Sequence, residues 1–154
     1  MLRKTVVLDT RRILAILPQR HPLVMVDRVL SFEAGRRLVG RKNISVGDAV
    51  MPGHFPGHPI FPGAALLEGL AQCCVLLFEL THGPLRHGEV PLFGSASARF
   101  LGMVRPGDVV RFEIEVIKMT SFAGVFKGRA LVDGGVVARC ELTMGRQKGD
   151  GSVF

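Results

Sequence analysis

A continuous apolar segment near the middle of the chain limits the possible folds more than any other feature. Residues 64–80 read AALLEGLAQCCVLLFEL, and only Glu68, Gly69, Gln72 and Glu79 interrupt the apolar side chains. Arranged as a helix, the segment is apolar on nearly all sides, which is typical of a helix enclosed by other elements. The segment is too short and too interrupted to predict a membrane span. We therefore predict a buried helix from about 63 to 80, roughly 27 Å long.

Strands are predicted on both sides of this helix. Apolar residues alternate with polar ones in segments bounded by turn residues, as in half-buried strands. The predicted strands cover residues 23–32, 37–45, 92–100, 109–118, 122–132 and 136–144. A short helix capped at Asp9 and Thr10 is expected to run to Leu17. This order predicts an α+β fold, with an antiparallel β-sheet wrapped around the long central helix.

The chain shows no sign of more than one domain. Its 154 residues suit one hydrophobic core, and no repeat or linker divides them. We predict a single domain over residues 1–154, with a flexible tail at about 146–154. One small sheet cannot cover a lone helix completely, so pairing with a second copy of the chain is favoured.

The charge balance indicates an acidic partner. The net charge is +7, from 20 Lys and Arg against 13 Asp and Glu. The basic residues are scattered and lack the interleaved aromatic residues of single-strand binders, so nucleic acid is a low-ranking alternative to an acidic protein.

The cysteines and the N-terminus predict a cytoplasmic protein. Cys73, Cys74 and Cys140 are odd in number and have no CxxC spacing, which fits neither a disulfide framework nor a zinc site. The start of the chain, MLRKTVVLDTRR, has no long apolar stretch or small-residue cleavage site, so no signal peptide is predicted.

A stiff loop precedes the predicted central helix. Residues 51–63 read MPGHFPGHPIFPG, with four prolines and three glycines that restrict or permit special backbone conformations. Such a loop can hold His54 in one place, as proton transfer requires. A turn residue is the ordinary alternative for His54. His58 lies at HxxxH spacing, but Pro56 and Gly57 exclude the helix that would align a metal pair, so no metal is expected.

The central helix contributes a second reactive group. Glu68 lies among apolar residues, where a carboxyl group can stay protonated and act as an acid. Gln72 is four residues later and shares its helix face. The free amides near Gly63, at the start of the helix, can stabilise a carbonyl oxygen that gains charge. These groups suit addition or elimination of water beside a thioester carbonyl.

Several segments resemble one enzyme family over nearly the whole chain. GHFPGHPIFPGAALLEGLAQ, residues 53–72, is similar to the signature of the (3R)-hydroxyacyl-[acyl-carrier-protein] dehydratases of bacterial fatty acid synthesis, of the FabZ type. The segments ILPQRHPLVMVDRVLSFEAGRRLVGRKNIS and VRPGDVVRFEIEVIKMTSFAGVFKGRALVDGGVVARCEL resemble the two flanking halves of that family. A sister family that also isomerises the product has Asp where this chain has Glu68.

The resemblance implies a hotdog fold and a homodimer, which in the family is commonly assembled into a trimer of dimers. It implies that His54 is the catalytic histidine and Glu68 the catalytic carboxylate, contributed by different subunits. Gly63 would bind the carbonyl oxygen through its amide, and Gln72 would support the site. The implied reaction converts (3R)-hydroxyacyl chains on acyl carrier protein into trans-2-enoyl chains, without a cofactor.

An apolar tunnel for the acyl chain and a protein partner that carries this chain are also expected. Phe55, Leu67 and Phe93 are predicted to line an apolar tunnel. The partner is an acyl carrier protein with a phosphopantetheine-linked acyl chain.

Two other functions compete with dehydration. A hotdog thioesterase would aim a carboxylate or an activated water at the thioester carbon, whereas the paired His54 favours elimination. A non-catalytic subunit that binds carrier protein is suggested by GSASARFLGMVRPGD, residues 94–108, which lacks the acid and the later arginines common in the family.

Overall fold

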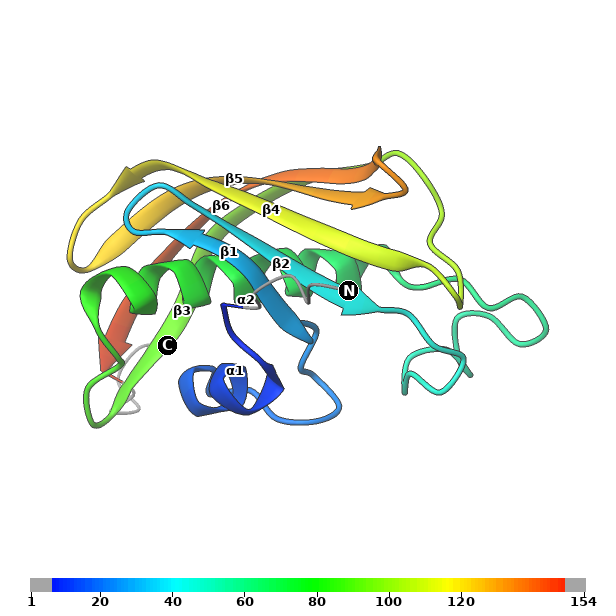
Figure 1. The fold of residues 1–154 in the computed structure, drawn as a ribbon, viewed down its shortest axis with the longest axis horizontal. Helices are drawn as coiled ribbons and strands as arrows, with labels where there is room; N and C mark the ends of the chain where they lie inside the picture. The colour runs from blue at the N-terminus through cyan, green and yellow to red at the C-terminus, as the bar shows by residue number, and fades with distance from the viewer. Residues whose placement is uncertain (1–6, 149–154) are drawn as a thin grey trace, which may run out of the picture.

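The structure, a computed structural model, describes residues 7–148 and contains one antiparallel sheet and two helices (Figure 1). The six-stranded sheet has the order β1-β2-β4-β5-β6-β3. Its strands are β1 (Arg28–Glu33), β2 (Arg37–Asn43), β3 (Glu89–Phe100), β4 (Val109–Met119), β5 (Ala123–Val132) and β6 (Gly135–Lys148). The helices are α1 (Thr10–Ile16) and α2 (Gly63–His82). The predicted α+β arrangement is confirmed, since the sheet curves around one long helix (Figure 1).

Helix α2 is buried because the sheet covers most of its surface. Phe112 of β4 lies so close to Gly69 that a β-carbon at this glycine would overlap the phenylalanine ring. On β2, a β-carbon at Gly40 would come within 2.7 Å of the Cys73 sulfur. These two glycines therefore let the helix and the sheet approach closely. By length and composition α2 could cross a membrane. However, 72% of its apolar 18-residue stretch is buried inside the fold, as in the core helix of a globular domain.

The helix begins and ends at residues that fit those positions. Pro62 precedes the first turn, where its missing amide costs nothing. Gly83 follows the last turn with a φ of 90° and donates its amide hydrogen to the Glu79 carbonyl. Positive φ is accessible to glycine at little cost, so the chain can leave the helix there.

Several predicted boundaries differ from the structure. Strand β3 begins three residues earlier than predicted, at Glu89, and β6 extends four residues further, to Lys148. Residues 23–27 were expected to belong to the first strand, but β1 begins at Arg28. The reason is that the Leu23 carbonyl and the Met25 amide bond to the side chain of Gln72 instead of to a neighbouring strand. The tail prediction is wrong for residues 146–148, since β6 pairs with β3 as far as Lys148. Residues 149–154 lie outside the described part of the chain.

Candidate active site

The loop between β2 and α2, residues 44–62, is called the histidine loop and folds into a closed turn around His54. The His54 amide donates to the Met51 carbonyl at 3.1 Å, and the His54 carbonyl accepts from the Ile60 amide at 2.8 Å. Between them, Phe55 and His58 exchange two backbone hydrogen bonds of 2.9 and 2.8 Å. The backbone of His54 is thus held from both sides, as the prolines and glycines of the loop predict.

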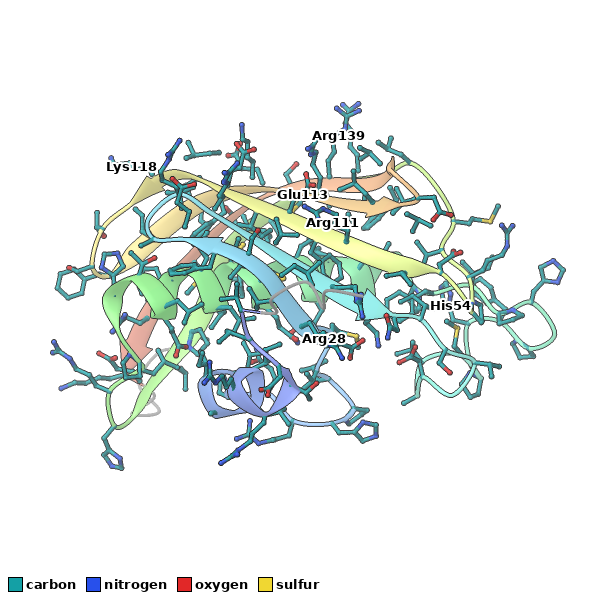
Figure 2. The ribbon with its side chains drawn as sticks, in the orientation of Figure 1. Arg28, His54, Arg111, Glu113, Lys118 and Arg139 are labelled. Atoms are coloured by element: carbon teal, nitrogen blue, oxygen red, sulfur yellow. The ribbon has the colours of Figure 1, made fainter. Side chains whose placement is uncertain are left out.

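The hydrogen bond of the His54 ring determines which nitrogen is free. Nδ1 lies 2.8 Å from the Ile60 carbonyl oxygen. Because a carbonyl oxygen can only accept, Nδ1 carries the hydrogen, and Nε2 of the neutral ring keeps its lone pair. The ring is partly buried and stacks on Phe55, with 4.1 Å between the ring centroids. Figure 2 shows His54 at one end of the molecule. A fixed imidazole with a free Nε2 is suited to act as a general base.

Gln72 connects the carboxyl group of Glu68 to the N-terminal segment. Its side chain is fully buried. Its oxygen accepts from the Met25 amide at 2.8 Å, so the nitrogen must face the other way. That nitrogen donates to the Leu23 carbonyl at 2.7 Å and to Oε1 of Glu68 at 2.9 Å. Glu68 is itself half-buried, and among the described residues its second oxygen, Oε2, has no recorded hydrogen-bond partner. Oε2 is therefore the oxygen that remains open to a further hydrogen-bond partner.

The first turn of α2 offers backbone donors. No side chain caps this turn at Pro62. Within residues 7–148, no acceptor is recorded for the amides of Gly63 and Ala64. The ring of Phe100 covers Gly63 so closely that a β-carbon there would lie 2.9 Å from the ring. Uncapped amides at a helix start, with the positive end of the helix dipole behind them, can stabilise an oxygen that gains negative charge.

The predicted substrate-binding residues lie in three places. Phe55 is on the histidine loop and is 52% exposed, whereas Leu67 is half-buried on α2 next to Glu68. Phe93 is on β3 and lines a surface hollow of about 600 Å³ with Lys118 and Met144. That hollow is lined by neither His54 nor Glu68.

The cysteines of α2 have no reactive character. Burial raises the pKa of Cys73 well above its ordinary range and does the same for Cys74. Both thiols stay neutral and pack as small apolar groups. In the part of the chain that is described, no three His, Cys, Asp or Glu side chains are grouped to hold a metal ion.

Some contributors to the site were not predicted. The Ile60 carbonyl orients His54, but any residue type supplies a carbonyl, so the sequence holds no signal for it. The buried Lys42, near the end of β2, and the partly buried Asp48, near the start of the loop, form an ion pair of 2.8 Å. A signal existed for Lys42, because it continues the alternation of the buried residues Leu38 and Gly40 along β2.

Comparison with protein families and curated proteins gives a consistent result. The family model described as a FabA-like domain matches residues 17–141. A protein of Cronobacter sakazakii named 3-hydroxyacyl-[acyl-carrier-protein] dehydratase FabZ is 46% identical over 145 residues, covering 94% of this chain and 95% of the relative. A protein of the same name from Latilactobacillus sakei is 44% identical over 138 residues, covering 88% and 96%.

Solved structures share the fold at low sequence identity. The dehydratase heterocomplex ApeI:P of Xenorhabdus doucetiae matches with a TM-score of 0.73 and 16% identity, covering 92% of each chain. A hot-dog-like protein of Thermanaerovibrio acidaminovorans matches with a TM-score of 0.61 and 24% identity, covering 77% of this chain and 86% of the other. The predicted hotdog fold is confirmed.

Proposed function

Because the chain belongs to the FabA-like family, and within it to the FabZ-type dehydratases, we propose that it is a hydro-lyase acting on (3R)-hydroxyacyl chains bound to acyl carrier protein. The product is the trans-2-enoyl thioester of fatty acid synthesis. The observation that best supports this proposal within the molecule is the His54 ring. Its Nδ1 is hydrogen-bonded to the Ile60 carbonyl, and its Nε2 has no hydrogen-bond partner among residues 7–148.

In the proposed mechanism, His54 acts as the base, the Gly63 amide stabilises the thioester oxygen and Glu68 acts as the acid. Nε2 of His54 removes a proton from C2 of the substrate, and the thioester oxygen that gains charge accepts a hydrogen bond from the Gly63 amide. The electron pair of the broken C2–H bond forms the C2=C3 double bond as the C3–O bond breaks. Oε2 of Glu68 donates a proton to the departing hydroxyl, which leaves as water. The proton on His54 later returns to Glu68, which restores both groups.

A homodimer is part of the proposal. Strand β3 lies at one edge of the sheet and pairs only with β6 among the described strands. Its central residues 94–98, GSASA, are small and mostly exposed. An open edge of small side chains is a template for pairing with another strand, here β3 of a second copy. We propose that His54 of one subunit and Glu68 of the other meet in each site.

The proposed partner is the acidic surface of the carrier protein. The net charge of +7 favours such a partner. Arg111 and Arg139 extend from the outer face of the sheet, away from α2 (Figure 2). This partner and a cytoplasmic location are consistent with enzymes of fatty acid synthesis.

Two substitutions test the roles of the proposed catalytic pair. His54→Ala removes the base and Glu68→Gln removes the acid, so each should lower turnover by about 100-fold or more. The assay follows the enoyl product on carrier protein by mass spectrometry, and a thiol reagent in parallel reports any thioester hydrolysis.

His58→Ala is the matched control, because this exposed side chain lies in the same loop and only its backbone holds the turn. It should keep near-normal turnover. Folded His54→Ala and Glu68→Gln proteins with normal turnover would overturn the assignment, and release of free thiol by the wild type would favour a thioesterase.

A further inference from the structure

Lys42 is a buried cation next to the histidine loop. It lies on β2 two residues after Gly40, on the strand face that packs toward α2. Its side chain is only 7% exposed. Long basic side chains are rarely buried to this extent unless they are paired, so its contacts call for an explanation.

The ammonium group of Lys42 contacts both ends of the loop. Nζ lies 2.8 Å from Oδ1 of Asp48, near the start of the loop, and 3.4 Å from the Asn43 carbonyl. It also lies 5.8 Å from the centroid of the Phe61 ring, at the end of the loop. The second carboxylate oxygen of Asp48 accepts from the Ser45 amide at 2.8 Å.

Asp48 and Phe61, at the two ends of the loop, are each connected to His54. The Asp48 carbonyl accepts from the Met51 amide at 2.9 Å, and the Met51 carbonyl accepts from the His54 amide at 3.1 Å. On the other side, Phe61 directly follows Ile60, whose carbonyl binds the ring of His54. The Phe61 amide is fixed at 2.7 Å to the Val104 carbonyl. The two connections that hold His54 therefore start at residues that contact Lys42.

We propose that Lys42 is a positioning residue for the dehydration, acting through Asp48 and Phe61 to place Nε2 of His54. This inference rests on the proposed function of His54. A buried ion pair is weak evidence for a gain in stability, because the loss of hydration offsets the attraction between the charges. A role in fixing one loop geometry explains the pair better, since a displacement of a base by about 1 Å can lower turnover strongly.

The test removes both charges together. The Lys42→Met, Asp48→Asn double variant keeps the side-chain volumes and leaves no unpaired buried charge. We expect kcat to fall about tenfold or more with KM changed less than about threefold. Amide hydrogen exchange should become faster at His54 and Ile60, while the amides of α2 keep their protection.

The matched control removes another lysine–carboxylate ion pair of similar length. Lys127 and Glu115 are paired at 2.9 Å and are both exposed. The Lys127→Met, Glu115→Gln variant should keep the wild-type kcat and the wild-type exchange in the loop.

Three outcomes would overturn the inference. The first is a folded Lys42→Met, Asp48→Asn variant with normal kcat, and the second is normal exchange at His54. The third is a decrease in kcat by the same factor when Lys42→Met and Asp48→Asn are added to His54→Ala. That result would show that Lys42 does not act through His54. If the double variant does not fold, Lys42→Arg takes its place under the same criteria. Normal turnover in His54→Ala alone would instead contradict the proposed function, while the exchange experiment would still test Lys42.

Discussion

Gln72 joins the candidate site to the core through a single buried amide. It binds the Met25 amide, the Leu23 carbonyl and the Glu68 carboxyl group, so three of its four hydrogen-bonding capacities are used. A buried backbone group that loses its partner costs about 1–3 kcal/mol. The same side chain therefore stabilises the fold and orients the proposed acid.

Gln72→Leu should lower the free energy of unfolding by roughly 2–4 kcal/mol, because the Leu23 and Met25 backbone groups lose their partners together. Urea unfolding followed by circular dichroism measures this change. Gln147→Leu is the control, since Gln147 is exposed near the end of β6 and should change stability little. Equal unfolding midpoints for Gln72→Leu and the wild type would show that other groups replace these hydrogen bonds.

Glu79 is a second buried acid, near the other end of α2. Burial raises its pKa from an ordinary value of 4.5 to about 7, although the Leu85 amide and the Arg146 guanidinium both lower it. One carboxylate oxygen is buried without a hydrogen-bond partner among the described residues. A carboxyl group with a raised pKa in the folded state favours folding below its unfolded pKa, and this contribution is lost as pH rises through the folded value.

Glu79→Gln should therefore remove a pH dependence of stability. Between pH 5 and 8, Glu79 should lower the wild-type free energy of unfolding by an amount on the order of 3 kcal/mol. Urea unfolding at several pH values measures the free energy of unfolding of both proteins. As pH rises, the variant should become increasingly more stable than the wild type. Glu115→Gln, at an exposed position, should follow the wild-type profile. A difference that is constant with pH would contradict the prediction.

At the scale of elements, the contact between α2 and β4 depends on the missing side chain of Gly69. The Phe112 ring occupies the space that a β-carbon would need. Gly69→Ala should destabilise the protein by about 1–3 kcal/mol, because the core cannot accept the extra methyl group without movement. Thermal unfolding measures the loss. Phe112→Leu in the Gly69→Ala background should cost less than Phe112→Leu alone, and additive losses would show that the two residues do not compete for space.

The sequence predicts those elements whose signals are local. The limits of α2 follow from Pro62, Gly63 and the long apolar run, and the alternation of β4 places it correctly. The segment 23–27 was assigned to a strand because its apolar pattern resembles one. Its backbone is satisfied by Gln72, which is 47 and 49 residues away from Met25 and Leu23. No local pattern contains that information.

Within the candidate site, too, local sequence signals are predictable and contacts that depend on the folded loop are not. His54, Glu68 and Gln72 are unusual for their surroundings, so the sequence suggests them directly. The hydrogen bond between Gln72 and Glu68 follows their spacing of four residues on one helix. The pairing of Lys42 with Asp48 and the role of the Ile60 carbonyl depend on the closed path of the loop, which only the structure describes.

At the scale of the whole molecule, we propose that each site is built from two chains. In one chain, helix α2 packs against the sheet and the histidine loop lies at one end of the molecule, while β3 leaves one edge of the sheet open (Figure 1). Pairing of two β3 strands would join the sheets of two copies around a twofold axis. Each dimer would then hold two equivalent sites, each with His54 from one subunit and Glu68 from the other.

This arrangement predicts that two inactive variants restore each other. In a heterodimer of His54→Ala and Glu68→Gln, one site has lost both groups and the other site has kept both. After unfolding and refolding of an equal mixture, half of the dimers should be mixed, so turnover should recover to roughly a quarter of the wild-type value. Each variant refolded alone is the control and should stay inactive. If His54 and Glu68 of one site came from the same chain, every site would lack one group, and the mixture would be as inactive as its components.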